Sequence, residues 1–218
     1  MAHPALSPLT SAHPRLSAHE RREQLLAVAV ELFSRKGFNG TTTREIAAAA
    51  GVTEAIIFRH FETKEQLYTA IIDRKLNSPD TAEWVTELRA AMDRNDDEAV
   101  IRKLIHGIIV AHKTDPQFER LMLYAALEGN EIALRHMRQM AESIIDLYRK
   151  YFLRRQKKGL LRAFAPDVAL TAIVGMARNY ASCKYLHGLK EQHLSDQQAL
   201  DSFTQIAMEG LAVTKRKR

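Results

Sequence analysis

Hydroxyl and cationic side chains gather at the starts of two short helices that the sequence predicts within residues 42–64. Thr42, Thr43 and Arg44 open the first of these helices. Backbone amides and hydroxyls at the start of a helix can bind a phosphate, and an arginine can reach a phosphate or a guanine edge. A plain N-cap is the alternative role for Thr42, although one threonine can serve both purposes. These residues therefore offer the chemistry of phosphate and base recognition.

The second short helix carries the other candidate contacts, which are Thr53, Glu54, Ala55, Phe58, Arg59 and His60. Ala55 could touch a thymine methyl group, and Arg59, which we expect to point outward, could reach a phosphate or a base. Glu54 could accept a hydrogen bond from cytosine. An acidic residue in the first turn also stabilises the helix dipole, so the role of Glu54 stays open between the two.

Local signals indicate how the two short helices are joined. Thr42 and Glu45 have the spacing of a capping box, which starts the first helix. Gly51 can end it, because glycine enters the left-handed backbone conformation at little cost. Val52 then fills the angle between the helices, and Thr53 can cap the second one. This is the layout of a helix-turn-helix, whose second helix enters the major groove of DNA.

The segment TREIAAAAGVTEAIIFRHFETKEQL resembles the DNA-binding segment of the TetR family of bacterial transcriptional repressors. The residues that match the family pattern are Thr42, Ile46, Ala47, Ala50, Gly51, Val52, Thr53, Ala55, Ile57, His60, Phe61, Lys64 and Leu67. The sequence departs from the pattern at Phe58, where tyrosine is usual, and at Ile56, where a small or hydroxylated residue is common. The resemblance covers about the first 76 residues, and the rest of the chain resembles the family only in its helical layout.

The resemblance implies a homodimeric repressor that binds a near-palindromic double-stranded DNA operator and is released by a small-molecule effector. His60 matches a family position that typically contacts the DNA backbone, with a structural histidine as the alternative. Phe58 keeps the ring of the usual tyrosine and can pack on a sugar or a thymine methyl group, but it cannot donate to a phosphate.

Lys64 lies in the first turn of a further helix, predicted over about residues 64–77. In the TetR family this helix joins the DNA-binding domain to the regulatory domain. A cation in the first turn opposes the helix dipole, which makes a phosphate contact a better explanation of Lys64 than an idle surface lysine.

Breaks in the pattern divide a chain that we expect to be all-α. Residues 1–16 predict a disordered arm, and residues 17–77 predict a three-helix helix-turn-helix domain with its linking helix. The sequence Ser78-Pro79-Asp80 marks the boundary, because proline favours the first turn of a new helix. A larger helical domain for ligand binding and dimerisation follows at 78–214, and 215–218 form a basic tail. Its helices are expected at about 80–93, 97–113, 116–127, 131–158, 166–188 and 196–213.

Two sets of residues within 78–214 are candidates for further sites. Small and apolar residues on the last two helices could form a four-helix interface between two subunits, or could pack inside one subunit. They are Gly175, Ala181, Phe203, Ile206, Ala207 and Gly210. The candidates for the ligand pocket, each of which could equally be an ordinary core residue, are Phe118, Met122, Tyr148 and Met176.

Composition bears on other classes of protein. The single cysteine, Cys183, cannot form an internal disulfide and fits a cytoplasmic location. The longest apolar run, at 168–177, is shorter than the roughly 20 residues that span a bilayer, so we expect no membrane contact. The net charge is +6, but the four residues 215–218 carry +4 of it, so charge alone says little about DNA binding.

Two alternatives to a repressor differ in their signatures. An all-helical enzyme lacks support, because no nucleophile motif, metal-ligand spacing or glycine-rich phosphate loop is present. We therefore expect no catalytic residue, no metal and no cofactor. An architectural DNA-binding protein without a ligand would lack a closed apolar cavity in its C-terminal part.

Overall fold

The computed structural model describes residues 16–189 and 194–212. The predicted arm, apart from Leu16, and the predicted basic tail at 215–218 lie outside the described residues. Within those residues the fold is all-α, as predicted, and the β contacts amount to one isolated bridge between Leu161 and Ala212.

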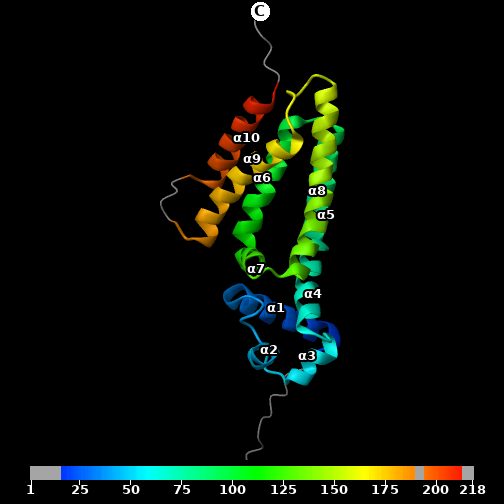
Figure 1. Ribbon diagram of the computed structural model, residues 1–218, viewed down its shortest axis with the longest axis vertical. Coiled ribbons are helices and arrows are strands. Elements are labelled where there is room, and N and C mark those ends of the chain that lie inside the picture. The colour runs from blue at the N-terminus through cyan, green and yellow to red at the C-terminus, as the bar shows by residue number, and fades with distance from the viewer. Residues whose placement is uncertain (1–15, 190–193, 213–218) are drawn as a thin grey trace, which may run out of the picture.

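Four helices form the end of the molecule that carries the helix-turn-helix (Figure 1). They are α1 (Ala18–Lys36), α2 (Thr43–Ala49), α3 (Glu54–His60) and α4 (Lys64–Leu76). The predicted start of α2 is confirmed, because Thr42 with Glu45 forms a complete capping box, and Ser17 with Glu20 forms another at the start of α1. Gly51 has a φ of 66°, the left-handed conformation that the turn between α2 and α3 requires.

The caps of α3 and α4 differ in detail from a complete capping box. Thr53 occupies the N-cap position of α3, but its hydroxyl makes no capping hydrogen bond. Thr63 accepts from the N–H of Gln66 at 3.1 Å, as a capping box requires. The side chain of Gln66, however, accepts from the N–H of Glu62 rather than that of Thr63, so the reciprocal half of this box is shifted by one residue.

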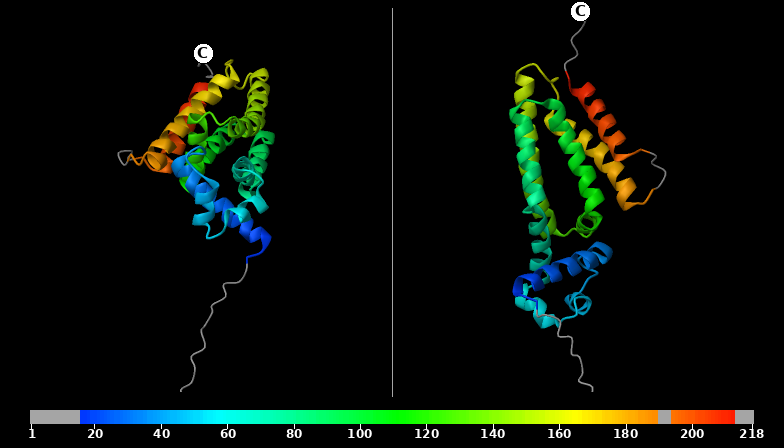
Figure 2. Two further views of the ribbon diagram at one scale, coloured as in Figure 1. Left: turned by 60° about the horizontal axis from the view of Figure 1, so that its bottom comes forward. Right: turned by 180° about the vertical axis from the view of Figure 1, so that it is seen from behind.

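The other helices form the part of the molecule that we call the body. They are α5 (Pro79–Asp93), α6 (Asp97–Thr114), α7 (Pro116–Leu127), α8 (Glu131–Lys157), α9 (Pro166–Ala181), the π-helix η1 (Ser182–Leu186) and α10 (Asp196–Leu211). Helix α6 packs against α5, α9 and α10. Helices α9 and α10 lie together at one edge of the body, opposite α5 and α8 (Figures 1 and 2).

The single α-helix predicted over 166–188 is wrong in its last turns, where η1 has the wider π geometry. A π turn brings residues five apart onto the same side of the helix. Tyr180 and Tyr185 are five apart, and both hydroxyls donate to Asp196 Oδ1, at 3.0 Å and 2.7 Å. The wider turn thus lets both tyrosine hydroxyls reach one carboxylate, that of Asp196 at the start of α10.

Buried apolar side chains form two clusters. The cluster inside the body contains fully buried Tyr148 and Phe152 from α8 and nearly fully buried Ile101 from α6. The cluster beneath the helix-turn-helix contains residues of α1 to α4, but it also contains body residues. These are Leu121, Met122 and Ala125 of α7 and Ala133 of α8. The core under the helix-turn-helix therefore extends beyond residue 77, where the sequence predicts a domain boundary.

Two ion pairs on α8 differ in burial and should differ in their effect on stability. Arg155 contacts Asp97 through two hydrogen bonds of 2.8 Å, and the two side chains are 11% and 15% exposed. We expect Arg155→Ala to lower the free energy of unfolding by about 3 kcal/mol, because Asp97 is left without its cation in a largely buried position. Arg149→Ala, whose partner Asp167 is 64% exposed, is the control and should change little. Denaturant unfolding of both variants measures the difference, and equal effects would contradict this assignment.

Candidate DNA-binding site

The start of α2 is exposed at Thr42 and Arg44, and its capping side chains are bonded to one another. Thr42 donates its N–H to Glu45 at 2.9 Å, and the Thr42 hydroxyl accepts from the N–H of Glu45 at 3.2 Å. Lys36 Nζ lies 2.7 Å from the other carboxylate oxygen of Glu45. Lys36 first, and then Thr42, lower the pKa of Glu45 to about 2. The negative charge of Glu45 is therefore balanced within the chain, and Arg44 beside it is exposed.

A side-chain hydrogen bond joins the first turns of α2 and α3. The hydroxyl of Thr43 donates to the carboxylate of Glu54. This contact holds the start of α3 against the start of α2, so Glu54 has a structural role. A contact between Glu54 and a base stays a prediction.

Helix α3 presents one exposed face, formed by Ala55, Phe58 and Arg59, which we call the outward face of α3. Their spacing of three and four residues puts them on the same side of the helix. The ring of Phe58 is 47% exposed, whereas Ile57, which points the other way, is fully buried. Thr53, at the N-cap, is also exposed. An exposed aromatic ring beside an arginine suits packing on sugars and contact with bases or phosphates.

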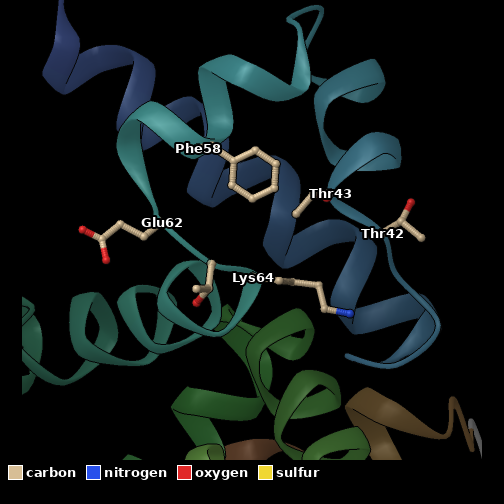
Figure 3. A pocket seen from close by; sticks show the side chains of 6 residues that line it. Thr42, Thr43, Phe58, Glu62 and Lys64 are labelled. Carbon is tan, nitrogen blue, oxygen red and sulfur yellow. The ribbon is translucent and has the colours of Figure 1, made fainter.

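The starts of α2 and α4 and the middle of α3 surround an open hollow of about 400 Å³ (Figure 3). Its lining residues are Thr42, Thr43, Phe58, Glu62, Thr63 and Lys64. Four of these six are predicted contacts, so the structure brings residues from three separate helices together. Glu62 and Thr63 were not predicted as part of the site. The capping signal that identified Thr42 could also have identified Thr63, since both residues are N-caps that line the same hollow.

Lys64 has an internal role that the sequence did not predict. Its ammonium donates to the carbonyl oxygens of Phe38 and Thr41 at 2.9 Å and 3.0 Å and lies 4.1 Å from the centre of the Phe38 ring. Two of its three donors are therefore used by the loop between α1 and α2, and one remains for a phosphate. Direct binding to DNA by Lys64 stays a prediction.

His60, at the end of α3, is half-buried. Burial lowers its pKa, and the positive charges of Arg59, Arg22 and Arg21 lower it further. The ring is therefore neutral at pH 7. Within the described residues its buried Nε2 has no hydrogen-bond partner. This environment fits a histidine that packs within the domain, and a contact with the DNA backbone stays a prediction.

The four candidate pocket residues do not meet in one place. Phe118 and Met122 of α7 belong to the cluster beneath the helix-turn-helix. Tyr148 is fully buried in the body cluster, where its hydroxyl donates to the carbonyl of Val100 at 3.3 Å. Met176 is half-buried on α9. Phe118 instead lines a separate, partly open cleft of about 660 Å³ between α1, α4, α5 and α7.

The six candidate interface residues differ in their exposure. Ala181 and Ala207 are buried in the core of their own chain, so they are not available to a partner subunit. Gly175 and Gly210 are exposed, and open space lies where a side chain would stand at each of them. They are therefore not points of close helix approach within the chain. Phe203 is half-buried, and Ile206 is 54% exposed.

Two properties of residues 16–189 and 194–212 concern membranes and metal ions. No helix there is both long and apolar enough to cross a membrane. The same residues contain no group of three or more histidine, cysteine, aspartate or glutamate side chains placed to hold a metal ion.

The sequence of this chain is similar to those of known DNA-binding regulators. The sequence profile described as "Bacterial regulatory proteins, tetR family" matches residues 25–71, which include α2, α3 and most of α1 and α4. The HTH-type transcriptional regulator RutR of Escherichia coli is 26% identical over 161 residues, which cover 74% of each protein.

Solved structures show the same fold over nearly the whole chain. NalD, the secondary repressor of the MexAB-OprM multidrug efflux pump in Pseudomonas aeruginosa, superposes with a TM-score of 0.68 at 20% identity and covers 93% of this chain and 100% of its own. AibR, solved in complex with isovaleryl coenzyme A and operator DNA, gives a TM-score of 0.63 at 22% identity, with 86% and 97% covered.

A helix-turn-helix at one end and a helical body behind it are the architecture of DNA-binding regulatory proteins, and this all-α chain has both parts. Residues 25–71 match the TetR family of bacterial regulatory proteins, and the chain is a transcriptional regulator. Its relatives are regulators rather than enzymes, which removes the all-helical enzyme as an alternative.

Arg59 and Lys64 should respond differently to removal. Arg59→Ala should weaken DNA binding and reduce the slope of log affinity against log salt by about one, without changing the melting temperature, because an exposed cation is lost. Lys64→Ala should also lower the melting temperature, because two carbonyl groups lose their donor. Titration of DNA at several salt concentrations, with a thermal melt of each variant, measures both effects. An unchanged slope for Arg59→Ala would remove this residue from the DNA interface.

Proposed function

We propose that this protein is a cytoplasmic, ligand-responsive repressor that binds a near-palindromic operator as a homodimer and is released by a small-molecule effector. The observation that carries the proposal is the outward face of α3, with exposed Phe58 and Arg59, beside the open start of α2. The binding of a small molecule as well as an operator is supported by AibR, which has been solved with both isovaleryl coenzyme A and operator DNA. The role as repressor is supported by NalD, which is itself a repressor.

The proposal divides the work between two parts of the chain. Residues 17–77 would contact the operator through Thr42, Thr43, Arg44 and the residues of α3. Residues 78–214 would hold the effector and the partner subunit. For the effector, the body cluster around Tyr148 is the first place to test. Phe118 and Met122 lie in the cluster beneath the helix-turn-helix, and Met176 is half-buried on α9.

Dimerisation is supported by an unpaired apolar face on the edge of the body. Val168 at the start of α9 is 67% exposed and Ile206 on α10 is 54% exposed. Gly175 and Gly210 leave open space on the same two helices, where a partner helix could approach closely. Two copies of α9 and α10 would then form a four-helix bundle about a two-fold axis. Such an axis would place the two α3 helices so that they read the two halves of a palindrome.

Selection of bound sequences from a random pool of double-stranded DNA, with the full chain as bait, tests the proposed function. We expect enrichment of a near-palindrome whose half-sites are about 34–36 Å apart, the spacing of successive major grooves on one side of the duplex. Recovery of unrelated sequences would contradict an operator-specific repressor. It would favour the architectural alternative, which binds DNA without reading it.

Ile206→Glu should convert the proposed dimer to a monomer. In the proposed interface of α9 and α10, the new carboxylate would lose its hydration and would lie near the same negative charge on the partner subunit. The control is Leu153→Glu, an apolar residue that is 43% exposed on α8, the helix at the opposite edge of the body. Light scattering coupled to size exclusion gives the mass of both variants. A dimeric Ile206→Glu variant, or a monomeric Leu153→Glu variant, would place the interface elsewhere.

A further inference from the structure

The loop between α1 and α2 (residues 37–42, the α1–α2 loop) is held by the body. Glu128 directly follows α7, and its two carboxylate oxygens accept from two successive backbone amides of this loop. Oε2 accepts from the N–H of Phe38 at 2.9 Å, and Oε1 accepts from the N–H of Asn39 at 3.2 Å. Hydrogen bonds from neutral donors to a charged acceptor are among the stronger ones in proteins. The contact joins residues about ninety positions apart in the sequence.

The same loop is held from the other side by α4. Lys64 donates to the carbonyls of Phe38 and Thr41, as described above. Phe38 therefore has its N–H bound to the body and its carbonyl bound to α4. The ring of Phe38 also contacts the rings of Phe33 and Tyr68, with centroids 5.8 Å and 5.2 Å apart. Little freedom is left for this residue without movement of α1, α4 or α7.

The end of α7 fits the end of α1 closely. Gly37 has a φ of 74°, and the carboxylate of Glu128 occupies the space where a side chain at position 37 would stand. Tyr124, one turn before Glu128, donates its hydroxyl to the carbonyl of Arg35 at 3.0 Å. A glycine in the left-handed conformation is what permits a carboxylate to approach the backbone here.

We propose that Glu128 is a positioning residue for DNA binding: it sets the α1–α2 loop, and with it Thr42 and the start of α2, from the body. This inference deepens the proposed function, on which it rests, by naming a second connection between the body and the helix-turn-helix besides α4. A shift of α7 that withdraws Glu128 releases two amides of the loop and moves the first turn of α2. Helix α7 thereby acts on the phosphate-binding end of α2, whereas α4 acts on the helix-turn-helix as a whole.

Charge distinguishes positioning from a general electrostatic effect. Glu128→Ala removes a negative charge from a DNA-binding protein, which by long-range electrostatics alone makes binding tighter. Loss of positioning makes binding weaker. The sign of the change therefore separates the two causes. Glu142→Ala, which removes an equal charge from an exposed position on α8, is the matched control.

The test uses the DNA fragment that the unaltered chain selects from the random pool, with affinities measured well below the melting temperature of each variant. We expect Glu128→Ala to bind about tenfold more weakly, within the usual range of coupling between sites, and Glu142→Ala to bind no more weakly than the unaltered chain. Glu128→Gln keeps the shape of the side chain but can accept only one of the two amides, so its loss should be intermediate. A role confined to stability would lower the melting temperature of Glu128→Ala and leave its affinity unchanged, which would overturn the proposal.

Two further measurements make the assignment specific. Hydrogen exchange of the Phe38 and Asn39 amides should become faster in Glu128→Ala without DNA, while α10 stays protected. In the double variant with Arg44→Ala, Glu128→Ala should reduce the DNA affinity by a smaller factor than it does alone. The reason is that the DNA contact of Arg44, which Glu128 helps to position, is already absent. Fully additive losses, or unchanged exchange at Phe38 and Asn39, would overturn the proposal. Failure of the unaltered chain to select any sequence would instead overturn the proposed function, since the exchange measurement needs no DNA.

Discussion

Two helices of seven residues carry the DNA-binding face, and helices of that length are not stable in water on their own. Their stability comes from packing, and the rest of the N-terminal end is arranged to supply it. Ile46 of α2 and Ile57 of α3 are fully buried against α1 and α4. The aromatic rings of Phe33, Phe38 and Tyr68 lock α1, the α1–α2 loop and α4 together. The start of α2 can be exposed because the residues behind it are packed in this core.

Most cationic side chains at the helix-turn-helix end bind acidic side chains or carbonyl groups of the same chain, which limits how many cations remain to bind DNA. Lys36 pairs with Glu45, Arg74 pairs with Glu23, and Lys64 binds carbonyl groups. The exposed arginines at positions 44 and 59 are then the cations best placed to meet phosphates or bases. A binding surface with few free cations depends more on shape and on individual contacts than on total charge. This agrees with the small net charge of residues 1–76, which hold 10 lysines and arginines against 8 aspartates and glutamates.

Local signals in the sequence predicted most of the fold, because helix starts are set by residues three positions apart. The capping pair of Thr42 with Glu45 is an example that the structure confirms. Contacts between distant residues could not be predicted in this way. The bonds of Lys64 to the α1–α2 loop and of Glu128 to the same loop have no local pattern, and the burial of Ala181 depends on which side of α9 faces α6. The outward face of α3 could be predicted from the sequence, because α3 is short and the buried Ile57 defines which side of it faces inward.

The core beneath the helix-turn-helix includes Leu121, Met122, Ala125 and Ala133, which follow α4 by more than forty residues. On the ribosome, where a chain emerges from its N-terminus, α1 to α4 are therefore complete in sequence well before their core can close. Until α7 and the start of α8 have been made, the fully buried side chain of Leu121 is absent, and Phe38 and Asn39 lack their acceptor. The nascent chain thus acquires a finished DNA-binding face only once its regulatory half is also being built.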